Sequence, residues 1–268
     1  MLPERVSQGQ VLKVLSHASG QARLQERMIR LFPQADGSFL GLMPVNALTK
    51  PGTYTLEWLD DHAQPVHRTD VAVTNAHFAK QNIVLTKALS GLHSTSDERE
   101  IVSAFLRETS ETRYWKEPLV APLPGCITSP FGVMRLHNGR PTGDYHAGLD
   151  QRGPFGSPIH AVSDGVVKIS RKFVLRGGTV AIDHGQGFES IYLHMSGFAA
   201  KEGDHVAAGD VIGYVGSSGR STGPHLHWTL YANGEPVSPM QWISGLKACP
   251  APKAPASVKR PRRRAPAA

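Results

Sequence analysis

The sequence predicts a mostly β protein: an immunoglobulin-like β-sandwich, then a connecting helix, then a second β-rich unit. Short runs of β-branched, aromatic and aliphatic residues fill both halves of the chain, and turn-forming glycines and prolines separate them. One segment near residue 100 has helical spacing. Runs this short, at this spacing, favour small sheets over long helices.

Residues 1–80 are predicted to form the sandwich. The clearest strand is Thr53–Leu59, in which Tyr54, Leu56 and Trp58 share one face. We expect Tyr54 and Trp58 in the core, with a binding surface as the alternative. Turns are expected at 35–38 and 50–53, and the other strand-like runs are Val11–Leu15, Leu24–Leu31, Phe39–Met43 and Val66–Val73.

Residues 81–122 are predicted to be a connecting strand and helix. In Ser94–Glu108, Thr95 and Glu98 have the spacing of a capping box, and apolar residues around Ile101 and Phe105 form one face. We expect this helix to dock one half of the protein on the other. It could also shade a groove on the second half.

The length and composition of the chain indicate its general class. A chain of 268 residues with 40% hydrophobic and 19% charged residues suits two globular units. No run approaches the roughly 18 apolar residues of a membrane span, so no transmembrane segment is expected. The first residues lack the pattern of a signal peptide.

Most of the net charge of +7 belongs to the tail. Residues 250–268 are rich in Pro and Ala and contain no acid, so we predict a disordered basic tail. Its expected partner is an anionic wall or lipid surface, with no specific nucleic acid, and the alternative is a solubilising tail. Its basic residues are Lys253, Lys259, Arg260, Arg262, Arg263 and Arg264.

Five side chains in the second half carry the chemistry. His146 and Asp150 lie in HAGLD, His194 in YLHMS, and His225 and His227 in GPHLHW. In an extended segment, residues an even number of positions apart lie on one face. His146 would therefore lie beside Asp150, and His225 beside His227. Catalytic zinc takes three protein ligands and keeps an open position. Three of the five can hold zinc, which leaves two histidines to act on a substrate.

An H-x-H pair such as His225 and His227 could arise by chance, because the chain has 13 histidines. Glycine-rich turns beside each cluster favour a site instead. The remaining isolated histidines, which we expect to be structural or on the surface, include His17, His62, His67, His77 and His93.

The segments TSPFG, YHAGLD, PIHAVSDGVV, SIYLHMS and GRSTGPHLHW follow one another between Pro124 and Ser244. In this order they resemble the M23 (lysostaphin/LytM-type) zinc metallopeptidases. The resemblance implies an antiparallel catalytic sheet within residues 123–249 and one zinc ion per chain. It also implies His146, Asp150 and His227 as zinc ligands and His194 and His225 as catalytic histidines.

The expected chemistry is metal-assisted amide hydrolysis. Zinc held by two neutral imidazoles and a carboxylate lowers the pKa of its water toward about 7. The chain has no H-E-x-x-H motif, so a histidine is expected to take the proton. One of His194 and His225 would do so, and the other would hydrogen-bond the tetrahedral intermediate.

The resemblance implies peptidoglycan cross-links as the substrate. We favour D,D-endopeptidase activity on D-alanyl–diaminopimelate bridges, in a periplasmic or secreted enzyme, because no SH3-type wall-binding module accompanies the unit. Two alternatives stay open: a non-cleaving peptidoglycan-binding activator, and a secreted antibacterial or host-directed wall peptidase.

The loops and the two cysteines of this unit lead to two further predictions. Four loops are expected to wall a cleft: 133–145, 171–177, 185–189 and 216–224. Cys126 and Cys249 bracket the unit and could form a disulfide, or remain two separate thiols.

Overall fold

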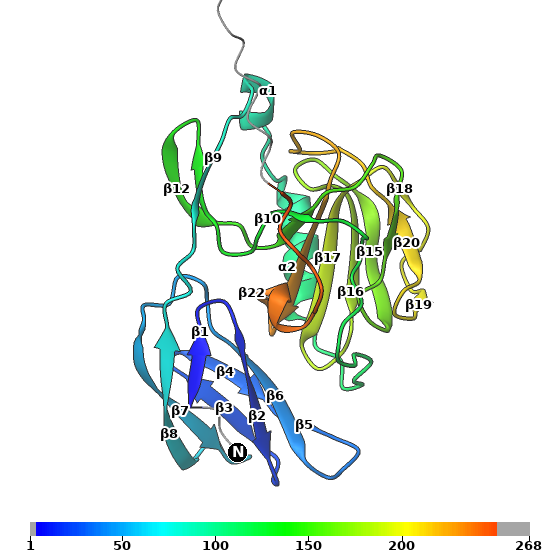
Figure 1. Ribbon diagram of the computed structural model, residues 1–268. Coiled ribbons are helices and arrows are strands. Elements are labelled where there is room, and N and C mark those ends of the chain that lie inside the picture. Colours follow the sequence, from blue (N-terminus) through cyan, green and yellow to red (C-terminus); the bar gives the residue numbers. More distant parts are fainter. Residues whose placement is uncertain (1–3, 251–268) are drawn as a thin grey trace, which may run out of the picture.

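The computed structural model describes residues 4–250 and is mostly β (Figure 1). The expected fold class is confirmed: a β-sandwich lies beside a larger antiparallel sheet, with a helix between the two in sequence. The predicted disordered tail falls almost entirely outside the described residues. No helix in the described part of the chain is long and apolar enough to span a membrane.

The N-terminal sandwich consists of two sheets. Leu56, Val71 and Leu12 are fully buried between them, and Tyr54 and Trp58 pack against this core as expected. All pairings are antiparallel except that of β1 with β8. One sheet has the order β1 (Arg5–Ser7), β8 (Pro65–Thr74), β7 (Gly52–Leu59), β3 (Gln21–Leu24), β4 (Arg27–Arg30), and the other β2 (Val11–Ser16), β6 (Phe39–Pro44), β5 (Phe32–Pro33).

The run Leu24–Leu31 is two strands rather than one. β3 ends at Leu24 and β4 begins at Arg27, because Gln25 takes a left-handed conformation with φ of 54° that turns the chain. A residue with positive φ cannot continue a strand.

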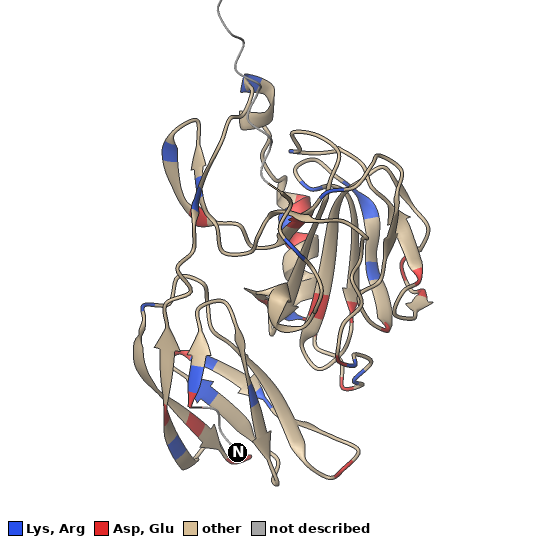
Figure 2. Ribbon diagram, in the orientation of Figure 1, with Lys and Arg blue, Asp and Glu red and all other residues tan. Residues whose placement is uncertain are grey.

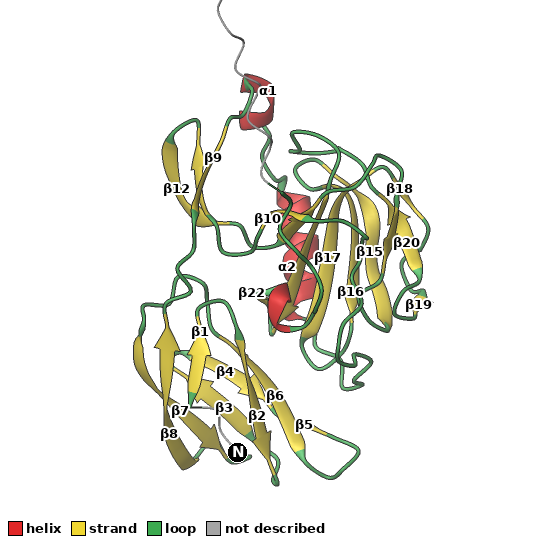
Figure 3. Cartoon of the chain, in the orientation of Figure 1, coloured by secondary structure: helices red, strands yellow, loops and turns green. Residues whose placement is uncertain are grey.

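The connecting segment contains β9 (Lys80–Ile83), the short helix α1 (Lys87–Ser90) and α2 (Ser96–Arg107). α2 begins where predicted, and the Thr95 hydroxyl accepts a hydrogen bond from the Glu98 amide at 3.1 Å. Its Val102 and Phe105 pack on strands of the C-terminal sheet, as Figure 3 shows for the helix as a whole.

The second half of the capping box is absent. The Glu98 carboxylate is fully buried and accepts hydrogen bonds from the amides of Leu175 and Arg176 and from the Arg176 guanidinium. Docking of α2 offers this carboxylate three donors, one of them charged, in place of the single amide at its own cap.

The C-terminal sheet is antiparallel throughout. β16 and β17 lie at its centre and are buried on both faces, and charged residues are few along them (Figure 2). The order is β10 (Ile127–Ser129), β13 (Leu149–Gln151), β21 (Leu226–Ala232), β17 (Phe188–Met195), β16 (Gly177–Asp183), β15 (Gly165–Phe173), β19 (His205–Val206), with β22 (Glu235–Val237) beside β21.

Two small sheets flank the large one. β14 (Pro158–His160), β20 (Val211–Tyr214) and β18 (Gly197–Phe198) form one. In the other, β9 pairs in parallel with β11 (Met134–His137), which forms a hairpin with β12 (Arg140–Tyr145). The stretch 133–145, expected as a loop, is therefore largely this hairpin, because the connecting strand β9 gives it a third strand to pair with.

The sandwich and the C-terminal part share an apolar core. Val11, Leu40 and Leu42 of the sandwich belong to the same buried cluster as Trp115 and Trp242. The Gln241 side chain, in the 3₁₀ turn η1 (Pro239–Gln241), also bonds both the amide and the carbonyl of Val11. A buried apolar contact of this kind fixes the two parts relative to each other.

Cys126 and Cys249 form a disulfide, with Cα atoms 4.8 Å apart. The next residues on the inner side, Ile127 and Ala248, form a parallel bridge. The bond therefore ties the start of β10 to the last segment after η1.

Candidate metal centre

Three of the predicted residues converge at one point. His146 follows β12, Asp150 lies in β13, and His227 lies opposite Asp150 in β21. His146 Nε2 is 3.0 Å from Asp150 Oδ1 and 3.0 Å from His227 Nδ1, and the last two atoms are 2.8 Å apart. The three form a group that can hold a metal ion.

The expected reason for this pairing is wrong for HAGLD. β12 ends at Tyr145 and β13 begins at Leu149, so His146 and Asp150 do not share one extended strand. They meet because the chain turns between the two strands, and period-two alternation plays no part.

Hydrogen bonds fix the orientation of both imidazoles. His146 donates from Nδ1 to the Pro130 carbonyl at 2.9 Å, and Nε2 of His227 lies 3.1 Å from the Thr229 hydroxyl. Because a carbonyl only accepts, the proton of a neutral His146 sits on Nδ1 and its Nε2 presents a lone pair. Such outer hydrogen bonds are typical of metal-binding histidines.

The electrostatics of the group suit a cation. Burial lowers the pKa of His227 to about 4, so its imidazole is neutral at neutral pH. Burial works to raise the pKa of Asp150, but hydrogen bonds from His146 and His227 outweigh it and hold this pKa well below the usual value. Two nitrogen lone pairs and a carboxylate oxygen facing one point match the donor set of a three-ligand metal site.

His194 and His225 lie beside this group, with ring centroids 5.0 Å apart. His194 donates from Nδ1 to the Ser218 carbonyl at 2.8 Å, and His225 from Nδ1 to the Gly223 carbonyl at 2.8 Å. His225 Nε2 is 3.9 Å from Asp150 Oδ1. Both rings therefore have their Nδ1 proton fixed by a backbone oxygen and keep Nε2 free as an acceptor.

A cleft of about 690 Å³ contains all five side chains. The hairpin and residues 81–85 of the connecting segment line one wall, and Leu175, Arg176 and residues 220–225 line others. Three of the four loops expected at the cleft therefore contribute to it. Residues 81–85 of the connecting segment, which include most of β9, also line it, whereas no residue of the helix α2 is among the lining residues.

The fourth loop, 185–189, does not line the cleft. It joins β16 to β17 at the end of the strands opposite His194, and its Gln186 amide bonds the Ser110 carbonyl. In a hairpin, the connecting turn lies at one end of the strands and the other strand ends lie at the opposite end. The 185–189 loop is therefore a strand length away from His194 and does not reach the site.

The sequence patterns did not predict several residues that contact the side chains of the site. Thr229 could have been found, because it lies two residues from His227 in one strand and shares its face. The carbonyls of Pro130, Ser218 and Gly223 leave no side-chain signal. Arg135 was also missed; its Nη2 lies 3.8 Å from Asp150 Oδ2.

The chain is similar to known peptidases. The sequence profile of peptidase family M23 matches residues 144–239. The DD-carboxypeptidase/endopeptidase Mpg of Neisseria meningitidis is 46% identical over 114 residues, 42% of this chain and 26% of Mpg. The peptidoglycan DD-endopeptidase ShyA of Vibrio cholerae is 40% identical over 115 residues, 43% of this chain and 27% of ShyA.

A solved structure resembles nearly the whole chain. A crystal structure named as an M23 peptidase of Pseudomonas aeruginosa superposes with a TM-score of 0.65 and 27% identity, over 88% of this chain and 94% of that one. Residues 144–239 of this chain carry a peptidase family M23 domain. The chain spans about a quarter of the length of the two curated relatives described.

Proposed function

We propose that this protein is a zinc-dependent D,D-endopeptidase that hydrolyses peptidoglycan cross-links. Residues 123–249 are the catalytic unit, one zinc ion binds per chain, and its ligands are His146, Asp150 and His227. The observation that carries the proposal is the convergence of three metal-ligand atoms beside two free imidazole nitrogens in one cleft.

A bound zinc ion supplies Lewis acidity to the scissile carbonyl and to the attacking water. The protein supplies the proton transfer. One of His194 and His225 takes the proton of the water on Nε2, and the other accepts a hydrogen bond at Nε2 from the hydroxyl of the tetrahedral intermediate. Because each Nδ1 proton is held by a carbonyl, either ring can donate from Nε2 only after it has gained a proton. The ring that accepts the proton is therefore the one able to return it to the leaving amine.

The substrate class follows from the relatives. Both curated relatives are named for DD-peptidase activity, and ShyA for action on peptidoglycan. We favour D-alanyl–diaminopimelate bridges as the scissile bonds. Such a substrate places the enzyme in the periplasm or outside the cell, where the disulfide Cys126–Cys249 is also stable.

The decisive experiment is muropeptide release from diaminopimelate-type sacculi, with bound zinc measured in parallel. The wild type should release monomers, and His227→Ala should lose both zinc and cleavage. His67→Ala, an exposed position on β8, is the matched control and should change neither. Zinc bound by the wild type without any cleavage would instead favour the non-cleaving peptidoglycan-binding activator.

A further inference from the structure

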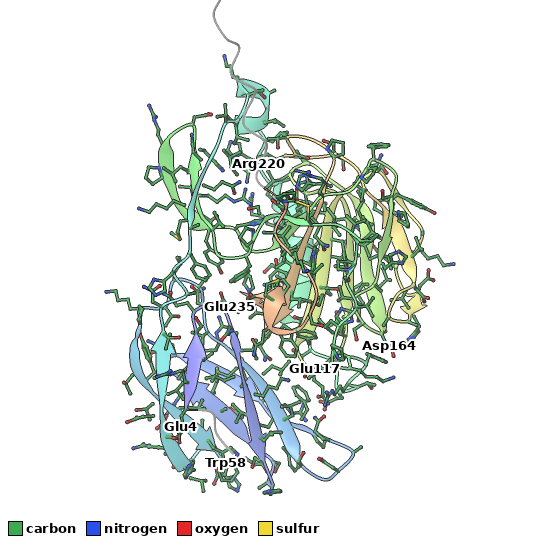
Figure 4. The ribbon with its side chains drawn as sticks, in the orientation of Figure 1. Glu4, Trp58, Glu117, Asp164, Arg220 and Glu235 are labelled. Atoms are coloured by element: carbon green, nitrogen blue, oxygen red, sulfur yellow. A yellow bond between two sulfur atoms is a disulfide. The ribbon has the colours of Figure 1, made fainter. Side chains whose placement is uncertain are left out.

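A group of basic side chains lies in the cleft next to the metal ligands. Arg135 and His137 of β11 and Arg220 of the 216–224 loop all line the cleft (Figure 4 labels Arg220). The Arg135 side chain is only 20% exposed. Arg135 and Arg220 are close enough for their like charges to interact. Holding two guanidinium groups together in this way costs free energy unless an anion joins them.

The carboxylates around this group offset only part of its positive charge. Asp150 Oδ2 pairs with Arg135 at 3.8 Å, but Asp150 Oδ1 contacts the imidazoles of His146 and His227, so this carboxylate is shared between Arg135 and the metal position. Asp144 acts on Arg135 from beyond ion-pair distance, and its Oδ1 accepts from the Tyr145 amide. Within residues 4–250, Arg220 has no carboxylate within 4 Å, whereas Arg176 is already paired with the buried Glu98.

We infer that Arg135 and Arg220 bind a carboxylate of the substrate that flanks the scissile amide. This inference rests on the proposed function and specifies which bond is cut. Guanidinium groups bind carboxylates with charge-assisted hydrogen bonds. Because Arg135 Nη2 lies 3.8 Å from Oδ2 of the proposed ligand Asp150, a carboxylate bound by Arg135 would lie close to the metal position.

The chemistry of the bridge provides such a group. In a D-alanyl–diaminopimelate bridge, the carbon attached to the scissile nitrogen also carries a free carboxylate. In a glycine bridge, the corresponding carbon carries an amide carbonyl without charge. The arginine pair therefore selects diaminopimelate bridges over glycine bridges, and it orients the leaving amine for protonation by a histidine.

A matched pair of substrates tests this assignment. Both are synthetic cross-linked dimers, one with the free carboxylate on the leaving side and one with the same group amidated. The wild type should cleave the free acid with a kcat/KM about 10- to 100-fold higher, the range of a charged hydrogen-bond pair. Arg135→Gln and Arg220→Gln should each lose much of this preference, mainly by slower cleavage of the free acid.

Controls separate the possible failures. Arg140→Gln, an exposed position of the same hairpin outside the cleft lining, should keep the wild-type preference. Bound zinc and the melting temperature are measured for every variant. If Arg135→Gln loses zinc, the result of Arg220→Gln is used, because within residues 4–250 Arg220 forms no ion pair with Asp150. Equal cleavage of both substrates by the wild type, or equal losses on both in the Arg220 variant, overturns the inference while the endopeptidase function stands. Failure of the wild type on both substrates contradicts the proposed function itself.

Discussion

Arg27 of the sandwich and Glu235 of β22 form an ion pair, with Nη2 and Oε2 2.6 Å apart. The other carboxylate oxygen of Glu235 accepts a hydrogen bond from Asn46, also in the sandwich. Burial raises the pKa of Tyr145, and the charge of Glu235 raises it further. Tyr145 directly precedes His146, so Glu235 joins the sandwich to the segment that carries this proposed metal ligand (Figure 4 labels Glu235).

Replacing this carboxylate should weaken the junction. Glu235→Gln is expected to lower the free energy of unfolding by about 1–3 kcal/mol, because two buried or half-buried donors lose a charged acceptor. Urea denaturation measures this change. The exposed Glu26→Gln is the control, and equal midpoints for the two variants would show that the contact contributes little.

Gly148 should be essential for the shape of the metal site. A Cβ atom at this position would lie 2.5 Å from the Thr229 hydroxyl and 2.6 Å from His227 Nε2. The hydrogen bond between these two groups would therefore have to shift. Gly148→Ala is expected to weaken zinc binding by about 10- to 100-fold, the usual cost of losing an outer hydrogen bond. Competition with a chelator measures the affinity. Gly52→Ala, whose added Cβ meets nothing closer than 3.9 Å, should bind zinc like the wild type.

The two free histidines should matter for turnover and not for the metal. His194→Ala and His225→Ala are expected to retain zinc and to lose about 10²- to 10⁴-fold in kcat, the range of general acid–base catalysis. Muropeptide release with a zinc assay measures both quantities. Near-normal turnover in both variants would contradict the proposed mechanism.

Glu189 should make the protein less stable as the pH rises. Its carboxyl is buried, neither oxygen has a hydrogen-bond partner within the described residues, and burial and then Asp183 raise its pKa well above 4.5. The folded state therefore holds this proton more tightly than the unfolded chain. Its contribution is fully present below about pH 4.5 and is lost as the pH rises toward the folded pKa.

A neutral replacement removes this dependence. Glu189→Gln should raise the melting temperature relative to the wild type at pH 8 and much less at pH 5. Differential scanning calorimetry across this range provides the measurement. A constant difference between the two proteins at every pH would mean that Glu189 does not titrate abnormally.

The disulfide closes a long loop, since Cys126 and Cys249 are 123 residues apart. Chain entropy predicts that Cys126→Ser with Cys249→Ser lowers the free energy of unfolding by at most about 4–5 kcal/mol. Thermal melts of the wild type with and without reductant should show a matching fall. A double variant that melts like the oxidised wild type would show that the adjacent strand pairing holds the ends without the bond.

Local patterns predicted much of the fold because they depend on neighbours in sequence. The alternation of Thr53–Leu59 correctly places Leu56 in the core, and Thr95 caps the helix as its spacing indicates. Glu98 is the counterexample. Its spacing fits a capping box, but a strand turn more than 70 residues away supplies better donors.

The sequence by itself determined the residue types of the site, the β character of both halves and the candidates for the disulfide. Only the tertiary structure decided which of these residues meet. The turn between β12 and β13 brings His146 to Asp150, and the pairing of β9 with β11 builds a wall of the cleft. The 216–224 loop brings Arg220 to the cleft that Arg135 also lines. Each of these contacts joins segments through strand register and domain docking, which arise from the packing of the whole chain and leave no mark in any short stretch of it.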